Sequence, residues 1–127
     1  MTRPETIYLK ASDAETLEQL ILGVGSGRDA LGAELLDEEL ARATIVEDDA
    51  LPPQTVALDS QVRFSDGQSD EVREVRLVLP SEAAPDEGRI SVLSPIGSAL
   101  IGLRAGDNID WPLPGGRIRR VHVLEVR

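Results

Sequence analysis

The hydrophobic pattern of this chain changes its period partway along, and that change limits what the chain can fold into. Up to about residue 45, apolar residues recur at spacings of three and four, as in amphipathic helices. From residue 62 they alternate, as in strands with one buried face. Between them, EDDALPPQ (47–54) is acidic and contains Pro52 and Pro53, which cannot continue a helix. The pattern predicts a helical part, residues 1–50, and a strand-rich part, residues 51–127.

The first part should contain two helices. The run from Ser12 to Glu15 has the form of a capping box, which predicts a helix that begins at about Asp13. The glycines of GVGSG (23–27) predict its end, and a second helix should follow from residue 28 to about 45. Two helices joined by a short glycine loop form an antiparallel hairpin. With about ten residues in its first helix, the hairpin should project roughly 15–20 Å.

The second part should contain several strands. Alternation predicts strands at 62–64, 75–79, 90–93, 109–113 and 118–126, with Ile109, Trp111 and Leu113 pointing inward. The apolar phase slips between Val123 and Leu124, which predicts a bulge or burial on both faces.

One short helix interrupts these strands. Ser94 followed by Pro95 has the form of an N-cap with proline at the first helical position, and the apolar face should run to Leu103. Gly97 and Ser98 should lie on its polar side. The whole chain is expected to be α+β: a short helical hairpin (1–50), then an antiparallel sheet that carries one helix (51–127).

Composition limits the chemistry. The chain has 127 residues and three aromatic side chains, Tyr8, Phe64 and Trp111, so its core must be aliphatic. It contains no cysteine, which suits a reducing compartment and removes thiolate sites. The start, MTRPETIYLK, has no apolar leader region, and no run is long enough to span a bilayer. We expect a cytoplasmic protein without a membrane contact.

The charge is unevenly distributed. The net charge of the chain is −10. Residues 1–50 contain twelve acids and four bases, and so carry most of this negative charge. Such a surface repels a phosphate backbone, so we expect no direct nucleic-acid binding; the acids would either dock on a basic protein surface or simply be solvated. GVGSG lacks the lysine and preceding strand of a phosphate loop, and His122 has no triad or metal partner in sequence. No cofactor or metal is expected.

One segment carries a family resemblance. SPIGSALIGLRAGDNIDWPLPGG, from Ser94 to Gly116, resembles the C-terminal FKBP-like domain of the Gre transcript-cleavage factors. IDWPLPGG, VALDSQVRF (56–64) and the short hairpin are similar to the Rnk family, the regulators of nucleoside diphosphate kinase. The resemblance implies a factor that grips the β′ coiled coil of bacterial RNA polymerase at the rim of the secondary channel. The gripping residues it implies are Ser91, Ser94, Pro95 and Ile96.

The hairpin tip departs from the Gre pattern. Transcript cleavage needs acids at the tip to hold a magnesium ion, and the apex GVGSG contains none. Of the tip residues Ser26, Arg28 and Asp29, only the last is acidic; its charge and that of Glu34 suit a helix N-terminus and a solvated helix surface. We therefore expect a non-catalytic factor that occupies the channel entrance and excludes longer factors.

Three alternatives stay open. An FKBP-like fold suggests prolyl isomerase activity as an alternative function, but such sites need an apolar pocket lined by several aromatic residues. The family name suggests a second alternative, that the protein regulates nucleoside diphosphate kinase, either by direct contact or indirectly through transcription. Finally, Ser94 and Pro95 could serve only as a helix start.

Overall fold

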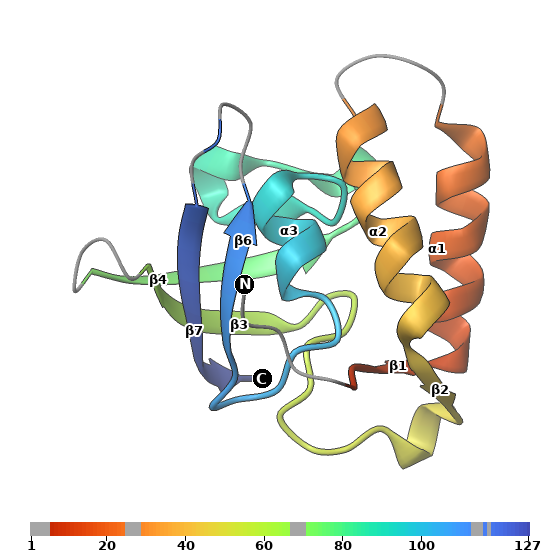
Figure 1. Ribbon diagram of the computed structural model, residues 1–127, viewed down its shortest axis with the longest axis horizontal. Helices are drawn as coiled ribbons and strands as arrows, with labels where there is room; N and C mark the ends of the chain where they lie inside the picture. The colour runs from red at the N-terminus through yellow and green to blue at the C-terminus, as the bar shows by residue number, and fades with distance from the viewer. Residues whose placement is uncertain (1–5, 25–28, 67–70, 113–115, 117) are drawn as a thin grey trace.

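The computed structural model describes residues 6–24, 29–66, 71–112, 116 and 118–127 of the chain. A helical hairpin stands beside a small sheet that is crossed by one short helix (Figure 1). The helices are α1 (Ala11–Gly23), α2 (Ala30–Arg42) and α3 (Pro95–Leu100). The strands are β1 (Tyr8–Lys10), β2 (Thr44–Val46), β3 (Gln61–Asp66), β4 (Val72–Val78), β5 (Arg89–Ser91), β6 (Asn108–Pro112) and β7 (Ile118–Val126). The α+β class is confirmed.

Helix α1 begins earlier than the sequence indicated. Ser12 lies inside its first turn, so the expected capping box is wrong. The backbone N–H of Ser12 instead donates to Oδ1 of Asp48, at 3.0 Å. Hydrogen bonds from the Ser12 hydroxyl and backbone N–H lower the pKa of Asp48. A carboxylate from beyond the hairpin therefore satisfies one of the free donors at the helix start.

The base of the hairpin is closed by a strand pair. β1 precedes α1, β2 follows α2, and the two run parallel, with Leu9 opposite Ile45. The N–H of Thr44 also donates to the carbonyl oxygen of Ile7, at 2.9 Å. This strand pair was not expected, and the second helix is shorter than predicted: α2 ends at Arg42, and β2 occupies positions where the sequence indicated the end of that helix.

The main sheet has the strand order β5-β4-β3-β7-β6. β3, β4, β6 and β7 pair antiparallel as expected, but β5 pairs parallel to β4, so the wholly antiparallel sheet was wrong at this edge. After β4 the chain passes through two 3-10 turns, Pro80–Glu82 and Pro85–Glu87, before β5 runs in the same direction as β4. This crossover takes the place of a tight antiparallel turn.

The expected bulge lies in β7. Arg63 is opposite Glu125 and Phe64 is opposite Val123, so Leu124 is the extra residue, and its side chain is exposed. On β6, Ile109 points into the core as expected. The inward positions expected for the Trp111 side chain and Leu113 lie outside the described residues.

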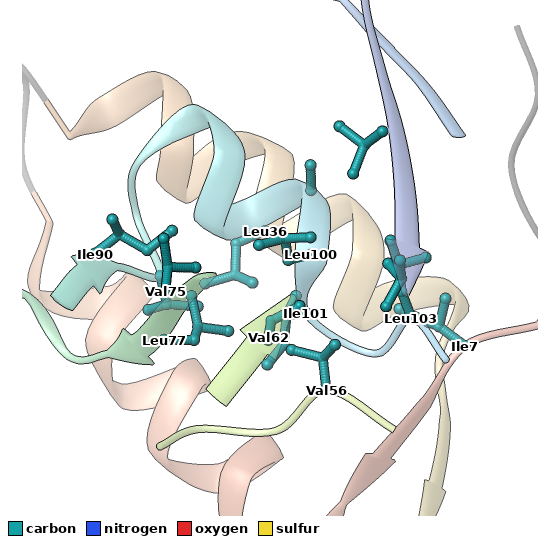
Figure 2. Close-up of a cluster of buried hydrophobic side chains, with 14 of the residues drawn as sticks. Ile7, Leu36, Val56, Val62, Val75, Leu77, Ile90, Leu100, Ile101 and Leu103 are labelled. Atoms are coloured by element: carbon teal, nitrogen blue, oxygen red, sulfur yellow. The ribbon is translucent and has the colours of Figure 1, made fainter. Parts of the chain in front are cut away.

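One aliphatic core joins the hairpin to the sheet (Figure 2). Leu36 of α2 lies beside Leu100 of α3, and Phe64 is fully buried in the same cluster. In Figure 1, α2 stands between α1 and α3, so the hairpin is packed side-on and is not the free projection that we expected. Each helix of the hairpin has 13 residues, or about 20 Å. In the described part of the chain, no helix is both long and apolar enough to cross a membrane.

Candidate functional site

The corner between β5 and α3 is held by two serines, Ser91 and Ser94. Oγ of Ser94 accepts from the N–H of Gly97 at 3.1 Å and donates to the carbonyl oxygen of Ser91 at 2.7 Å. Oγ of Ser91 in turn accepts from the N–H of Leu93, at 3.0 Å. The predicted N-cap and the proline at the first helical position are confirmed. These bonds fix the strand-to-helix corner without help from a large side chain.

Helix α3 is more buried than its sequence indicated. It ends at Leu100 rather than near Leu103, and Gly97 and Ser98, expected on a polar side, are both buried. A Cβ at position 97 would overlap the carbonyl oxygen of Ser91, so a glycine is needed for this close approach. Oγ of Ser98 donates to the carbonyl oxygens at positions 94 and 95, at 3.0 and 3.1 Å. The Ser98 hydroxyl, which the sequence pattern placed in solvent, is thus buried and hydrogen-bonded to the backbone of its own helix.

A pocket of about 530 Å³ opens at this corner. All four residues that the resemblance implied for gripping line it: Ser91, Ser94, Pro95 and Ile96. Pro95 is exposed, and the other three are half-buried. The remaining walls are mostly apolar and come from the β4–β5 crossover, β5, the turn after β5 and one residue before α2: Pro80, Ala83, Pro85, Ile90, Leu93 and Asp29. The corner therefore presents a hollow and not a flat surface.

The hairpin contributes to the same pocket. Asp29, named above as a tip residue, lies directly before α2 and lines the pocket together with the β5–α3 corner. α2 approaches the corner closely where Gly32 meets the backbone of Leu93. The other tip residues, Ser26 and Arg28, lie outside the described residues. The sequence could not place Asp29 in the same pocket as Ser94, because their segments are brought together by the packing of α2 on α3.

Other chemistries find little support at this site. The described residues that line the pocket include no aromatic side chain, as a prolyl isomerase site would need, and Phe64 is fully buried in the core. Among the described residues no group of three or more His, Cys, Asp or Glu side chains could hold a metal ion. His122 lies beside Asn108 on the neighbouring strand, with its Nδ1 at hydrogen-bond distance from the amide oxygen.

Two family descriptions match the chain. "Transcription elongation factor, GreA/GreB, C-term" matches residues 51–127, and "Rnk N-terminus" matches residues 5–46. The first match covers the main sheet, α3 and the corner, and the second covers the hairpin with its β1–β2 pair.

Individual relatives agree with these matches. "Regulator of nucleoside diphosphate kinase" from Escherichia coli (strain K12) is 36% identical over 126 residues, which is 99% of this chain and 91% of that protein. "Transcription elongation factor GreA" from Clostridium novyi (strain NT) is 38% identical over 92 residues, 72% of this chain but 57% of that protein. A solved structure, "Prokaryotic transcription elongation factor GreA/GreB from Nitrosomonas europaea", has 40% identity and a TM-score of 0.75 over 98% of both chains.

Proposed function

This chain belongs to the GreA/GreB family of transcription factors, in its Rnk branch, and we propose that it is a non-catalytic regulator that binds bacterial RNA polymerase. One observation supports this proposal above the others: the four residues to which the resemblance gives a gripping role line a single pocket. The partner surface is the β′ coiled coil at the rim of the secondary channel. A regulatory and not an enzymatic role also agrees with the name of the Escherichia coli relative.

The corner is well suited to receive another protein. Pro95 and Ile96 offer apolar surface, and the hydrogen bonds of Ser94 hold the backbone in place before a partner arrives. A rigid, preformed pocket loses little conformational entropy when it is occupied, so more of the contact energy appears as affinity.

The hairpin supports binding without cleavage. Its apex sequence, GVGSG, carries no acid that could hold a second magnesium ion. Its helices have 13 residues each, and α2 is packed on α3, so little of the hairpin's length of about 20 Å extends beyond the corner. The protein would thus sit at the channel entrance and compete there with longer Gre-type factors.

Competition for polymerase tests this proposal. Purified core polymerase is incubated with a labelled GreA-type factor, and the unlabelled parent chain should displace it. The variant Pro95→Arg should displace it at least about tenfold less well, because a long charged side chain would enter the pocket. Pro53→Arg, the same change at an exposed proline outside the pocket, should compete like the parent. Equal competition by both variants would reject the corner as the docking site.

A cleavage assay tests the second half of the proposal. Backtracked elongation complexes incubated with the parent chain and magnesium should shorten their RNA no faster than complexes alone. Faster shortening would contradict the argument from the acid-free apex.

The name of the Escherichia coli relative supports a second candidate, direct contact with nucleoside diphosphate kinase. A pull-down with the tagged full chain, probed for polymerase and for the kinase, separates the two. If the tagged chain still captures the kinase when only these two purified proteins are mixed, without polymerase, the second candidate is favoured.

A further inference from the structure

We propose that Asp29 is the charged wall of the docking pocket, and that the protein segment seated there carries a lysine or arginine next to an apolar side chain. The inference rests on the proposed function, because the pocket is the same. It adds a recognition residue from the hairpin and the chemistry of the partner segment. It also makes the hairpin part of the docking surface itself.

The composition of the pocket supports a cationic partner. Among the described residues that line it, Asp29 is the one with a charged side chain; the others are apolar or carry a hydroxyl. The side chain of Asp29 is half-buried. A charge at the edge of an apolar hollow is screened less than one on an open surface, so it contributes strongly to the choice of partner.

The carboxylate of Asp29 is available to a partner. Although Asp29 occupies the N-cap position of α2, its side chain makes no capping hydrogen bond. Its backbone carbonyl accepts from the N–H of Ala33 at 2.9 Å, so Asp29 contributes to the start of α2 through its backbone and not through its carboxylate. Within the described part of the chain, the carboxylate has no hydrogen bond or ion pair. Changing this side chain should therefore alter recognition more than folding.

The position of Asp29 is fixed by packing. One helical turn further along, the backbone of α2 touches Leu93 at Gly32, and Leu36 is fully buried in the shared core. This packing holds the start of α2, and with it Asp29, at the same pocket as Pro95. A preorganised pair of edges favours a partner with a matching spacing of charge and apolar surface.

The charges decide which occupant fits. An apolar segment without a cation would leave the carboxylate partly desolvated and unpaired, which is costly. An acidic segment would be repelled by Asp29 and by the acid-rich first 50 residues of the chain. A segment with a lysine or arginine beside an apolar residue avoids both penalties.

The test measures binding of the full chain to purified core RNA polymerase. Asp29→Asn should weaken binding by about five- to tenfold, and Asp29→Lys by more, because it places like charges together. Glu38→Gln is the matched control: it removes one negative charge from an exposed position of the same helix, outside the pocket. It should change the affinity by less than about twofold, and the defect of Asp29→Asn should shrink at high salt.

Each other outcome has a defined meaning. If Asp29→Asn binds like the parent while Pro95→Arg binds weakly, the role of Asp29 is rejected and the docking site stands. If Asp29→Asn and Glu38→Gln are weakened equally, the effect is one of net charge and the inference is again rejected. If Pro95→Arg also binds like the parent, both proposals fail. Circular dichroism and thermal melting confirm that each variant is folded.

Discussion

Gly32 of α2 lies directly against the carbonyl oxygen of Leu93, and a Cβ at position 32 would overlap that atom. Two backbones meet at this point, with no side chain between them. The distance between the hairpin and the docking corner is therefore set by the one residue type that lets them come so close.

Gly32→Ala should destabilise the protein. Alanine favours a helix by about 1 kcal/mol over glycine, but here its methyl group can be accommodated only if α2 or the corner moves. We expect the free energy of unfolding, measured in guanidinium chloride, to fall by about 1–3 kcal/mol. Gly23→Ala is the control, because a Cβ there meets nothing within 4 Å, and it should be neutral or slightly stabilising. Equal stability of the two variants would contradict the close approach.

Leu36→Ala should show that the hairpin and the sheet share one core. Leu36 has 0% exposure, so its truncation should cost about 2–5 kcal/mol, and the loss should appear in one unfolding transition for the whole chain. Leu22→Ala, at a side chain that is 79% exposed, should change stability by less than about 0.5 kcal/mol. Two separate transitions, with the sheet unaffected by Leu36→Ala, would argue against a shared core.

Ser94→Ala should lower stability by about 1–2 kcal/mol, because it removes both the helix cap and the bond to the Ser91 carbonyl. Hydrogen exchange of the Gly97 amide should accelerate, since that N–H loses its acceptor. Ser81→Ala, at an exposed serine, should leave melting unchanged. This cost is also why Pro95→Arg is a better probe of docking than a change at Ser94.

Asp13 should make stability depend on pH. This buried carboxyl accepts from the N–H of Leu58 at 3.0 Å. Burial raises its pKa, and the Leu58 N–H and Lys10 offset this in part. The folded state therefore favours the protonated form, so the contribution of Asp13 is fully present below its unfolded pKa, about 3.9, and is lost as the pH rises through the folded value. The unfolding free energy of the parent minus that of Asp13→Asn should fall over this range.

Asp48 should show the opposite trend. Its pKa is lowered by the hydroxyl and N–H of Ser12, so its contribution is present above the unfolded pKa and is lost as the pH falls through the folded value. Relative to Asp48→Asn, the parent should lose its advantage in acid, below about pH 3.9. Urea unfolding across this range, run in parallel with Asp13→Asn, checks both signs. Parallel trends for the two variants would mean that one assignment is wrong.

Local signals in the sequence were reliable where the structure depends on neighbours in the chain. Ser94 with Pro95 predicted the start of α3, and the phase slip at Leu124 predicted the bulge. The period change after Pro53 located the passage from helices to strands. In each case the signal could be read from a short stretch of the chain, although the bulge itself forms in the pairing of β7 with β3.

The errors come from contacts between distant segments. The predicted capping box at the start of α1 was wrong because the N–H of Ser12 is satisfied by the carboxylate of Asp48, 36 residues away. The parallel pairing of β5 depends on the path of a crossover, and the burial of Ser98 depends on carbonyl acceptors that a helical pattern does not reveal. The resemblance supplied the corner residues, but no local signal placed Asp29 in their pocket.

The β1–β2 pair fastens the hairpin at its base, and the contact of α2 with Leu93 fastens its side. Neither attachment involves the turn between the two helices. Whole helical turns inserted there, in matching number on both helices, should lengthen the hairpin outward and leave the pocket edge at Asp29 in place. The same two attachments could thus hold hairpins of different length, so engineered chimaeras could vary the length of the hairpin without changing the docking pocket.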